Sequence, residues 1–145
     1  MPRTKPIAKE MLLYCRPGFE GDLSAELVSK TGYLGYDGYP VAQEGSGFVR
    51  FVLPDDLPVN ELHRQLPLHD LVFARQTLVA LPPLIFLSRE DRLSPIIEQV
   101  VQSGWSFESI WQETPDTNDG KALAGLIKAL KRPLEANLRK KGALR

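Results

Sequence analysis

The sequence MLLYCRPGFEGDLSAELVSK, residues 11–30, contains the clearest indication of the fold of the first half of the chain. Its first five residues are an apolar run, which predicts a short strand that the turn Arg16-Pro17-Gly18 ends. Leu23 and Leu27 then stand four residues apart, and this spacing predicts a helix over residues 20–30. The chain is therefore expected to begin with a strand, a turn and a helix.

A hairpin is the next expected element. Gly45-Ser46-Gly47 separates two stretches of strand-forming residues, 36–44 and 48–53, and a glycine-bearing connection of three residues is typical of a β-hairpin. Within the second stretch, alternation places Val49 and Phe51 on one face of the sheet and Arg50 on the other.

A second helix and a fourth strand complete the pattern. Pro58 suits a first helical position, Leu62 and Leu66 lie on the inner face of that helix, and residues 71–81 predict a strand. The resulting order predicts an α+β fold over residues 11–81, a ferredoxin-like βαββαβ sandwich with its helices on one face of an antiparallel sheet. Residues 1–10 are expected to form a flexible N-terminus.

Residues 82–145 predict a second, α/β unit. Its first helix is expected to have Ser94 as N-cap, Pro95 at the first position and Gly104 at its C-terminal end. The apolar face of this helix consists of Leu93, Ile96, Ile97, Val100 and Val101.

A single strand and a final helix are expected next. Residues 107–113 predict the strand, and Pro133 is expected to break or kink the helix. One strand cannot satisfy its backbone hydrogen bonds without neighbours, so either it joins the first sheet or its partners lie beyond Arg145. The buried face of the final helix is expected to contain Leu123, Leu126, Ile127 and Leu130.

Charge is distributed unevenly along the chain, although the formal net charge is zero. Residues 119–145 carry a net charge of plus six and the first 118 residues carry minus six. On the final helix Lys121, Lys128 and Arg132 fall on one stripe about 16 Å long. Such a stripe can meet successive phosphates of a polyanion, or it can be an ordinary solvated face. Further cations of the same region are Lys131, Arg139 and Lys140.

Two turn regions offer weaker candidates for binding. Asp116-Thr117-Asn118 precedes the final helix, where Thr117 or Asn118 can serve as an N-cap, or the free N–H groups can face a phosphate. Arg16 follows a strand end at a Pro-Gly turn, so it projects toward solvent or a partner, or it pairs locally with Glu20.

Several other residues are expected to be structural. Cys15 is the one cysteine, which excludes an internal disulfide and favours a reducing, cytoplasmic location, and it is expected to be a core residue. His63 and His69 lack companions at metal-ligand spacing. Trp105 and Trp111 are expected to be packing residues.

Several motifs that would indicate cofactor binding or catalysis are not visible in this sequence. Neither a glycine-rich loop between a strand and a helix nor a Ser-His-Asp or metal constellation is visible, so this chain alone is expected to bind no cofactor and to catalyse nothing. The longest apolar runs are too short to cross a bilayer.

Several segments together resemble the bacterial large-subunit ribosomal RNA 2′-O-ribose methyltransferase M family. The resemblance covers residues 11–145, and its most specific element is the first of these segments. In chain order they are Cys15-Arg16-Pro17-Gly18-Phe19-Glu20, Phe73-Ala74-Arg75-Gln76, Asp91-Arg92 with Pro95-Ile96, Asp116-Thr117-Asn118, and Pro133-Leu134 with Leu138-Arg139.

The resemblance implies that this chain is the front of a three-part enzyme. The parts would be a ferredoxin-like domain, an RNA-gripping THUMP domain, of which residues 82–145 are the N-terminal portion, and a Rossmann-like domain that binds S-adenosylmethionine and is absent here. The implied partner is large-subunit ribosomal RNA in the peptidyl-transferase region, where a cytidine ribose would be methylated. Arg16 and Arg75 then join the basic residues and Asn118 as candidate RNA contacts, and the chain is expected to be a monomer.

The sequence also allows a function other than that of an enzyme. A ferredoxin-like unit can also stand alone as a regulatory or protein-interaction module, perhaps dimeric through its sheet, without enzymatic activity. RNA binding that weakens steeply with salt would distinguish the first reading from this one.

Overall fold

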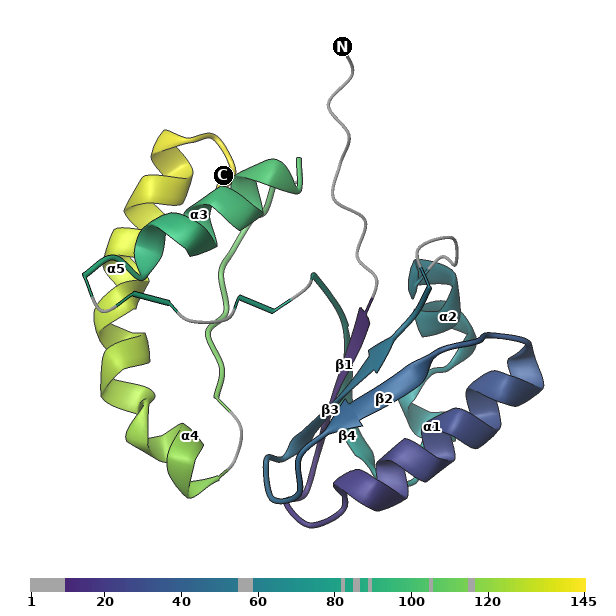
Figure 1. Ribbon diagram of the computed structural model, residues 1–145. Coiled ribbons are helices and arrows are strands. Elements are labelled where there is room, and N and C mark those ends of the chain that lie inside the picture. The colour runs from purple at the N-terminus through teal and green to yellow at the C-terminus, as the bar shows by residue number, and fades with distance from the viewer. Residues whose placement is uncertain are drawn as a thin grey trace. The chain divides into compact units, whose positions relative to one another are not determined.

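The computed structural model divides the chain into two compact units, which are described separately (Figure 1). The ferredoxin-like unit comprises residues 8–82 and 115–121, and the C-terminal unit comprises residues 1–7, 83–114 and 122–145. The structure describes residues 10–54, 59–81, 83–84, 87–88, 90–104, 106–114 and 117–145, without the side chains of Asn118 and Asp119.

The ferredoxin-like unit contains a four-stranded antiparallel sheet with strand order β2-β3-β1-β4. Helices α1 and α2 cover one face of this sheet (Figure 1). The predicted α+β, ferredoxin-like βαββαβ fold is therefore confirmed. Its elements are β1 (Glu10–Cys15), α1 (Glu20–Leu34), β2 (Tyr39–Ala42), β3 (Phe48–Val52), α2 (Val59–Gln65), the short 3₁₀ helix η1 (Leu68–Asp70) and β4 (Ala74–Ala80).

The core of this unit follows the predicted alternation. Val49 and Phe51 are fully buried, whereas Arg50 lies on the other face, where its guanidinium donates to both carboxylate oxygens of Glu10. Leu62 and Leu66 face the core, as the helical spacing predicts. A Cβ at Gly38 would stand 2.7 Å from the Phe51 ring, so only glycine lets this segment approach the core so closely.

The buried carboxylate of Glu20 ties α1 to the hairpin. It accepts hydrogen bonds from the backbone N–H groups of Gly18 at 2.9 Å, Gly45 at 3.0 Å and Gly47 at 2.8 Å. Burial raises the pKa of Glu20, but these backbone donors outweigh burial and hold the pKa below its ordinary value. The predicted local ion pair between Arg16 and Glu20 is therefore wrong. The Glu20 carboxylate instead accepts hydrogen bonds from the backbone of Gly45 and Gly47, which lie 25 and 27 residues away in sequence.

Element boundaries in the first unit differ from the prediction in four places. Helix α1 continues through Gly32 to Leu34, and it is Gly35, with φ of 86°, that caps the helix in the left-handed region. Strands β2 and β4 are shorter than predicted, since β2 is limited to Tyr39–Ala42 and β4 begins at Ala74 rather than at residue 71. Glu10 belongs to β1 rather than to a flexible N-terminus, whereas residues 1–9 and Pro58 lie outside the described residues.

The C-terminal unit is built around two helices, α3 (Leu93–Gln102) and α5 (Ala124–Lys140). The predicted apolar face of α3 packs against buried Leu134 and Leu138 of α5, as expected. After α5 the chain turns at Gly142, with φ of 79°, and Leu144 forms a parallel bridge with Phe107. Leu93, Ile96, Ile97, Val100 and Val101 all contribute to this cluster.

Three predictions about this unit are wrong. Residues 107–113 form no strand, and the parallel bridge at Phe107 is the one sheet-like pairing of that segment among the described residues, because no neighbouring strand is present to extend it. Helix α5 continues through Pro133, so the predicted break of the helix at this residue is wrong. Arg92, rather than Ser94, is the N-cap residue of α3, and the Asp91 Oδ1 one residue earlier accepts the N–H of Ser94 at 3.0 Å.

The buried face of the last helix lies further along the chain than predicted. Leu123 is 47% exposed, since it occupies the turn that separates α4 (Asn118–Ala122) from α5. Leu126, Ile127 and Leu130 are half-buried, and the buried leucines are Leu134 and Leu138. This shift leaves the first half of α5 more open to solvent than the second half.

Candidate nucleic-acid interface

The predicted basic residues of α5 are exposed. Lys128, Lys131 and Arg132 lie in the open first half of the helix, and Arg139 and Lys140 lie in its last turn. The last-turn cations also interact favourably with the C-terminal end of the helix dipole, which is a sufficient structural reason for their presence. The first three have no such helical reason, and they are the stronger candidates for binding an anion.

Lys121 does not share a helix with these residues. It belongs to α4, which ends at Ala122, so the predicted single stripe from Lys121 to Arg132 is wrong. Residues 115–121 also group with the ferredoxin-like unit. Lys121 is exposed, and it stays a separate candidate.

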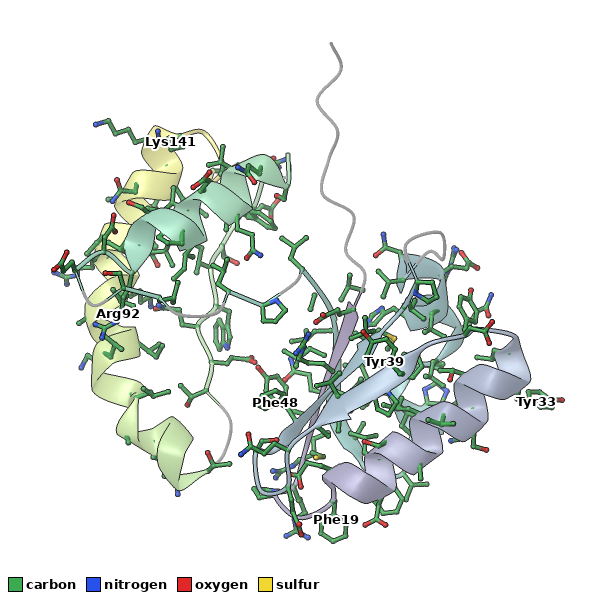
Figure 2. All side chains as sticks on the ribbon, in the orientation of Figure 1. Phe19, Tyr33, Tyr39, Phe48, Arg92 and Lys141 are labelled. Atoms are coloured by element: carbon green, nitrogen blue, oxygen red, sulfur yellow. The ribbon has the colours of Figure 1, made fainter. Side chains whose placement is uncertain are left out.

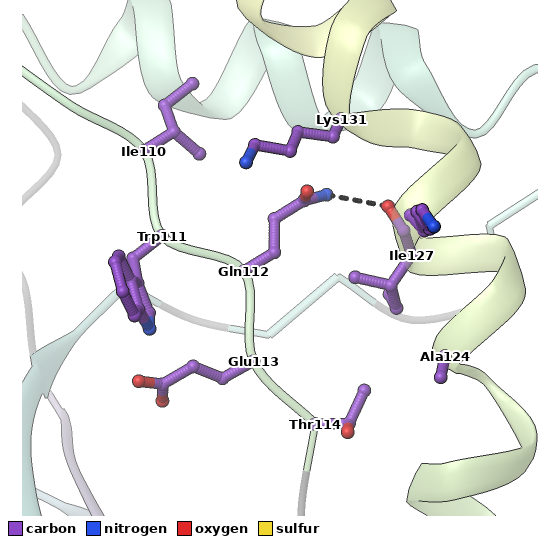
Figure 3. A pocket seen from close by; sticks show the side chains of 9 residues that line it. Ile110, Trp111, Gln112, Glu113, Thr114, Ala124, Ile127 and Lys131 are labelled. Atoms are coloured by element: carbon purple, nitrogen blue, oxygen red, sulfur yellow. Dashed lines mark hydrogen bonds between the residues drawn. The ribbon is translucent and has the colours of Figure 1, made fainter.

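A hollow lies beside the basic part of α5. Its volume is about 360 Å³, and one wall is the extended segment Ile110–Thr114 while α5 forms the other (Figure 3). The amide Nε2 of Gln112 donates to the Ile127 carbonyl at 3.1 Å, which fastens this segment to the helix. From α5 the hollow is lined by Ala124, Ile127, Lys128 and Lys131.

Side chains of the extended segment alternate in direction. Gln112 and Thr114 are half-buried and point toward α5, whereas Trp111 and Glu113 are exposed and point to the other side (Figure 3). The Lys131 side chain reaches from α5 toward the same segment (Figure 3). Lys128, Lys131 and Trp111 therefore line one hollow from two different elements, while the Trp111 ring itself points away from α5.

Trp111 is not the packing residue that the sequence predicts. Its side chain is 83% exposed, which is unusual for the largest side chain in proteins. The sequence does carry a signal for this exposure, because Trp111 alternates with Ile110 and Gln112, and neighbouring residues of an extended segment point to opposite sides. Trp105 lies outside the described residues.

The segment before α4 is capped by a side chain. Thr117 Oγ1 accepts the N–H of Gly120 at 2.9 Å, which confirms one of the two predicted caps. This cap is a sufficient structural reason for a Thr at position 117. Helix α4 has only five residues, so its N-terminus is a weak candidate for binding a phosphate. Asn118 begins α4, and the position of its side chain lies outside the description.

Arg16 and Arg75 lie at one end of the ferredoxin-like sheet. Cys15 pairs with Ala74 and Tyr14 pairs with Gln76, so Arg75 is the extra residue of a β-bulge next to Arg16. Both arginines are exposed. Cys15 itself is a core residue, as predicted, and burial together with the charge of Glu20 raises its pKa to about 11, against the lowering effect of Arg75.

His63 and His69, the two histidines of the chain, both lie beside polar neighbours in the ferredoxin-like unit. His63 is half-buried, with its Nε2 3.3 Å from Thr77 Oγ1, and His69 is exposed beside Asp70. Within the described part of the chain, no group of three His, Cys, Asp or Glu residues is placed to hold a metal ion. Over the same residues, no helix combines the length and apolar character needed to span a membrane.

Comparison with family models gives two matches that follow one another along the chain. Residues 8–78 match the RlmM ferredoxin-like domain. Residues 91–145 match the N-terminal model of ribosomal RNA large subunit methyltransferase M. The second match contains all of α3, α4 and α5, and hence the basic helix and the hollow beside it.

Similar full-length proteins carry the same name. The chain is 68% identical over 136 residues to ribosomal RNA large subunit methyltransferase M of Chromohalobacter salexigens, which covers 94% of this chain and 38% of that protein. It is 38% identical over 134 residues to the protein of that name from Xanthomonas axonopodis pv. citri, and 36% identical over 137 residues to that of Alteromonas mediterranea. Each of these two alignments covers 92% of this chain and 38% of the relative. The chain therefore spans about two fifths of the length of these relatives.

Proposed function

Because the chain belongs to the ribosomal RNA large subunit methyltransferase M family, we propose that it is the RNA-binding N-terminal region of such an enzyme. The observation that carries this proposal is the exposed group of Lys128, Lys131 and Arg132 on α5, beside an open hollow. Each cation that neutralises a phosphate releases condensed counterions, so several cations on one face give affinity that adds up and falls with salt. The proposal takes residues 82–145 as the front of a THUMP-like domain.

The parent reaction is part of the same proposal. The enzyme would transfer a methyl group from S-adenosylmethionine to the ribose 2′-hydroxyl of a cytidine in the peptidyl-transferase region of large-subunit ribosomal RNA. The described sheet is antiparallel and offers no strand-to-helix glycine loop of the kind that cradles this cofactor, so we assign no cofactor contact to these residues. Their role is to hold the RNA.

Binding to RNA tests the proposal directly. The chain should bind large-subunit ribosomal RNA fragments with an affinity whose logarithm falls linearly with the logarithm of salt concentration. Lys128→Glu and Arg132→Glu should each lower that slope by about one or more, because each removes a phosphate contact. Filter binding or fluorescence anisotropy over a range of salt concentrations measures this slope.

A matched control separates a local site from general charge. Arg64→Glu makes the same charge change on α2, where the Arg64 side chain is 75% exposed and pairs with Glu61. This variant should bind RNA with the slope of the unchanged chain. If all three variants bound RNA equally well, α5 would not be the RNA-binding face.

RNA methylation in cells tests the proposed reaction, which is the 2′-O-methylation of one cytidine of large-subunit ribosomal RNA. Large-subunit RNA from a strain that lacks the full-length gene should lose one 2′-O-methylcytidine in the peptidyl-transferase region, as mapped by mass spectrometry of nuclease fragments. The full-length gene should restore it, and the gene with Lys128→Glu and Lys131→Glu should restore it poorly. Retention of every 2′-O-methylcytidine without the gene would contradict the proposed reaction.

A further inference from the structure

The extended segment beside α5 carries an exposed ring and an exposed carboxylate on the same side. Trp111 is 83% exposed, and Glu113 projects beside it, away from α5 (Figure 3). Gln112 points the other way and is held by its hydrogen bond to the Ile127 carbonyl. The ring and the carboxylate are therefore presented by a segment that is fastened to the helix.

An exposed indole has a chemical use next to lysines. A nucleic-acid base can stack on an aromatic ring while neighbouring phosphates are bound by cations, and stacking tolerates every base because each has a π face. Lys128 and Lys131 line the same hollow as Trp111, but the Trp111 ring points away from α5, so a base stacked on the ring and phosphates held by these lysines would belong to different nucleotides of one strand that crosses the extended segment. Single-stranded RNA supplies the unstacked bases that this contact needs.

The carboxylate narrows the choice of base. Glu113 would repel a phosphate, but it can accept hydrogen bonds from an exocyclic amino group, as acidic side chains do with cytosine N4. Uracil has no amino group, whereas cytosine, adenine and guanine each have one. An amino-bearing base on Trp111 therefore satisfies both exposed side chains.

We infer that Trp111 and Glu113 form a subsite for one unpaired, amino-bearing base of RNA, while phosphates of neighbouring nucleotides bind Lys128 and Lys131 of α5. The inference rests on the proposed RNA-binding function and deepens it. It assigns recognition of a base to the extended segment and binding of the phosphates to α5.

Tyr33 of α1, in the ferredoxin-like unit, provides a control for this inference. Its ring is also exposed, at 93%, and it projects away from its helix (Figure 2).

Intrinsic fluorescence can report on this subsite alone. The chain has two tryptophans, so Trp105→Phe leaves Trp111 as the one indole. Titration of this variant with short oligocytidylate should quench its fluorescence, because a stacked base contacts the ring directly. Oligouridylate should bind at least several-fold more weakly, and Glu113→Gln should reduce that preference.

Affinity measurements complete the test. Trp111→Ala should weaken binding of oligocytidylate roughly fivefold or more, which corresponds to the loss of one stacked base. Tyr33→Ala removes a similarly exposed ring of the ferredoxin-like unit and should leave the affinity unchanged. Circular dichroism of each variant confirms that it is folded.

The possible failures are distinguishable. If the chain bound oligocytidylate with a steep salt dependence, but Trp111→Ala bound equally well and the indole showed no quenching, the subsite would be wrong and the proposed RNA-binding function would stand. If the chain bound no RNA at low salt, both would be wrong. Equal binding of oligouridylate and oligocytidylate would overturn the role of Glu113.

Discussion

Leu13, Leu27 and Phe51 of the ferredoxin-like unit are fully buried, whereas the most buried apolar residue described in the C-terminal unit, Leu138, keeps 3% of its surface exposed. The first unit joins four strands through ladders between distant segments. The second joins two helices and a single bridge. The larger and more deeply buried core therefore belongs to the ferredoxin-like unit, whereas the α5 cations and the exposed Trp111 ring lie on the unit with the smaller core.

Removing the largest buried ring of the first unit should have the greatest effect. Phe51→Ala should lower the free energy of unfolding by about 3–5 kcal/mol, because it leaves a cavity under the sheet. Chemical denaturation measures this change. Tyr33→Ala, which removes an exposed ring, should change the free energy by less than about 0.5 kcal/mol. Similar losses for the two variants would contradict the described core.

The equivalent change in the second unit should cost less. Leu138→Ala should lower the stability of the α3–α5 pair by about 2–3 kcal/mol, the low end for a buried leucine, because the smaller cluster around it leaves fewer contacts to lose. Amide hydrogen exchange of α3 and α5 measures this effect within the unit itself. A loss as large as that of Phe51→Ala would show that the two cores are equally well packed.

Glu20 should make the hairpin of the first unit sensitive to acid. Its pKa is lower in the folded chain than in the unfolded one, so its stabilisation is fully present above the unfolded pKa, ordinarily about 4.5, and is lost as pH falls through the folded value. Glu20→Gln should cost about 1–3 kcal/mol near neutral pH and much less in acid. Urea denaturation at several pH values measures both quantities, and an effect that did not change with pH would contradict this role.

The basic face of α5 should matter least for stability. Lys128→Glu should change the free energy of unfolding by less than about 0.5 kcal/mol, because Lys128 is an exposed residue outside the cluster around Leu134 and Leu138. The same variant is expected to weaken RNA binding. Thermal denaturation alongside the binding assay measures the contrast, and a large loss of stability would make Lys128 structural.

Much of this fold could be predicted from local patterns. The apolar run before Arg16, the glycines at 45 and 47, and the spacing of Leu62 and Leu66 each indicate an element whose periodicity is set by neighbours in sequence. The face of α3 is another such case. These predictions are confirmed because the pattern of burial within a strand or a helix depends mainly on its own repeat.

Contacts between distant segments could not be predicted from the local spacing of apolar residues. The sequence indicated a strand over residues 107–113, but strand formation needs a neighbouring strand, and the described structure supplies only the bridge of Phe107 with Leu144. The role of Glu20 depends on glycines more than 20 residues away. Neither the turn at Leu123 nor its effect on the basic stripe has a clear local signal.

Residue type and short-range spacing are enough to indicate the βαββαβ order, the apolar faces and the concentration of positive charge near the C-terminus. The packing of distant segments sets which of the alternating residues 110–113 faces solvent, so that Trp111 is exposed, and it places Lys121 on α4 rather than on α5. The physical reason is that the exposure of a side chain depends on what packs against it, and those partners come from distant parts of the chain.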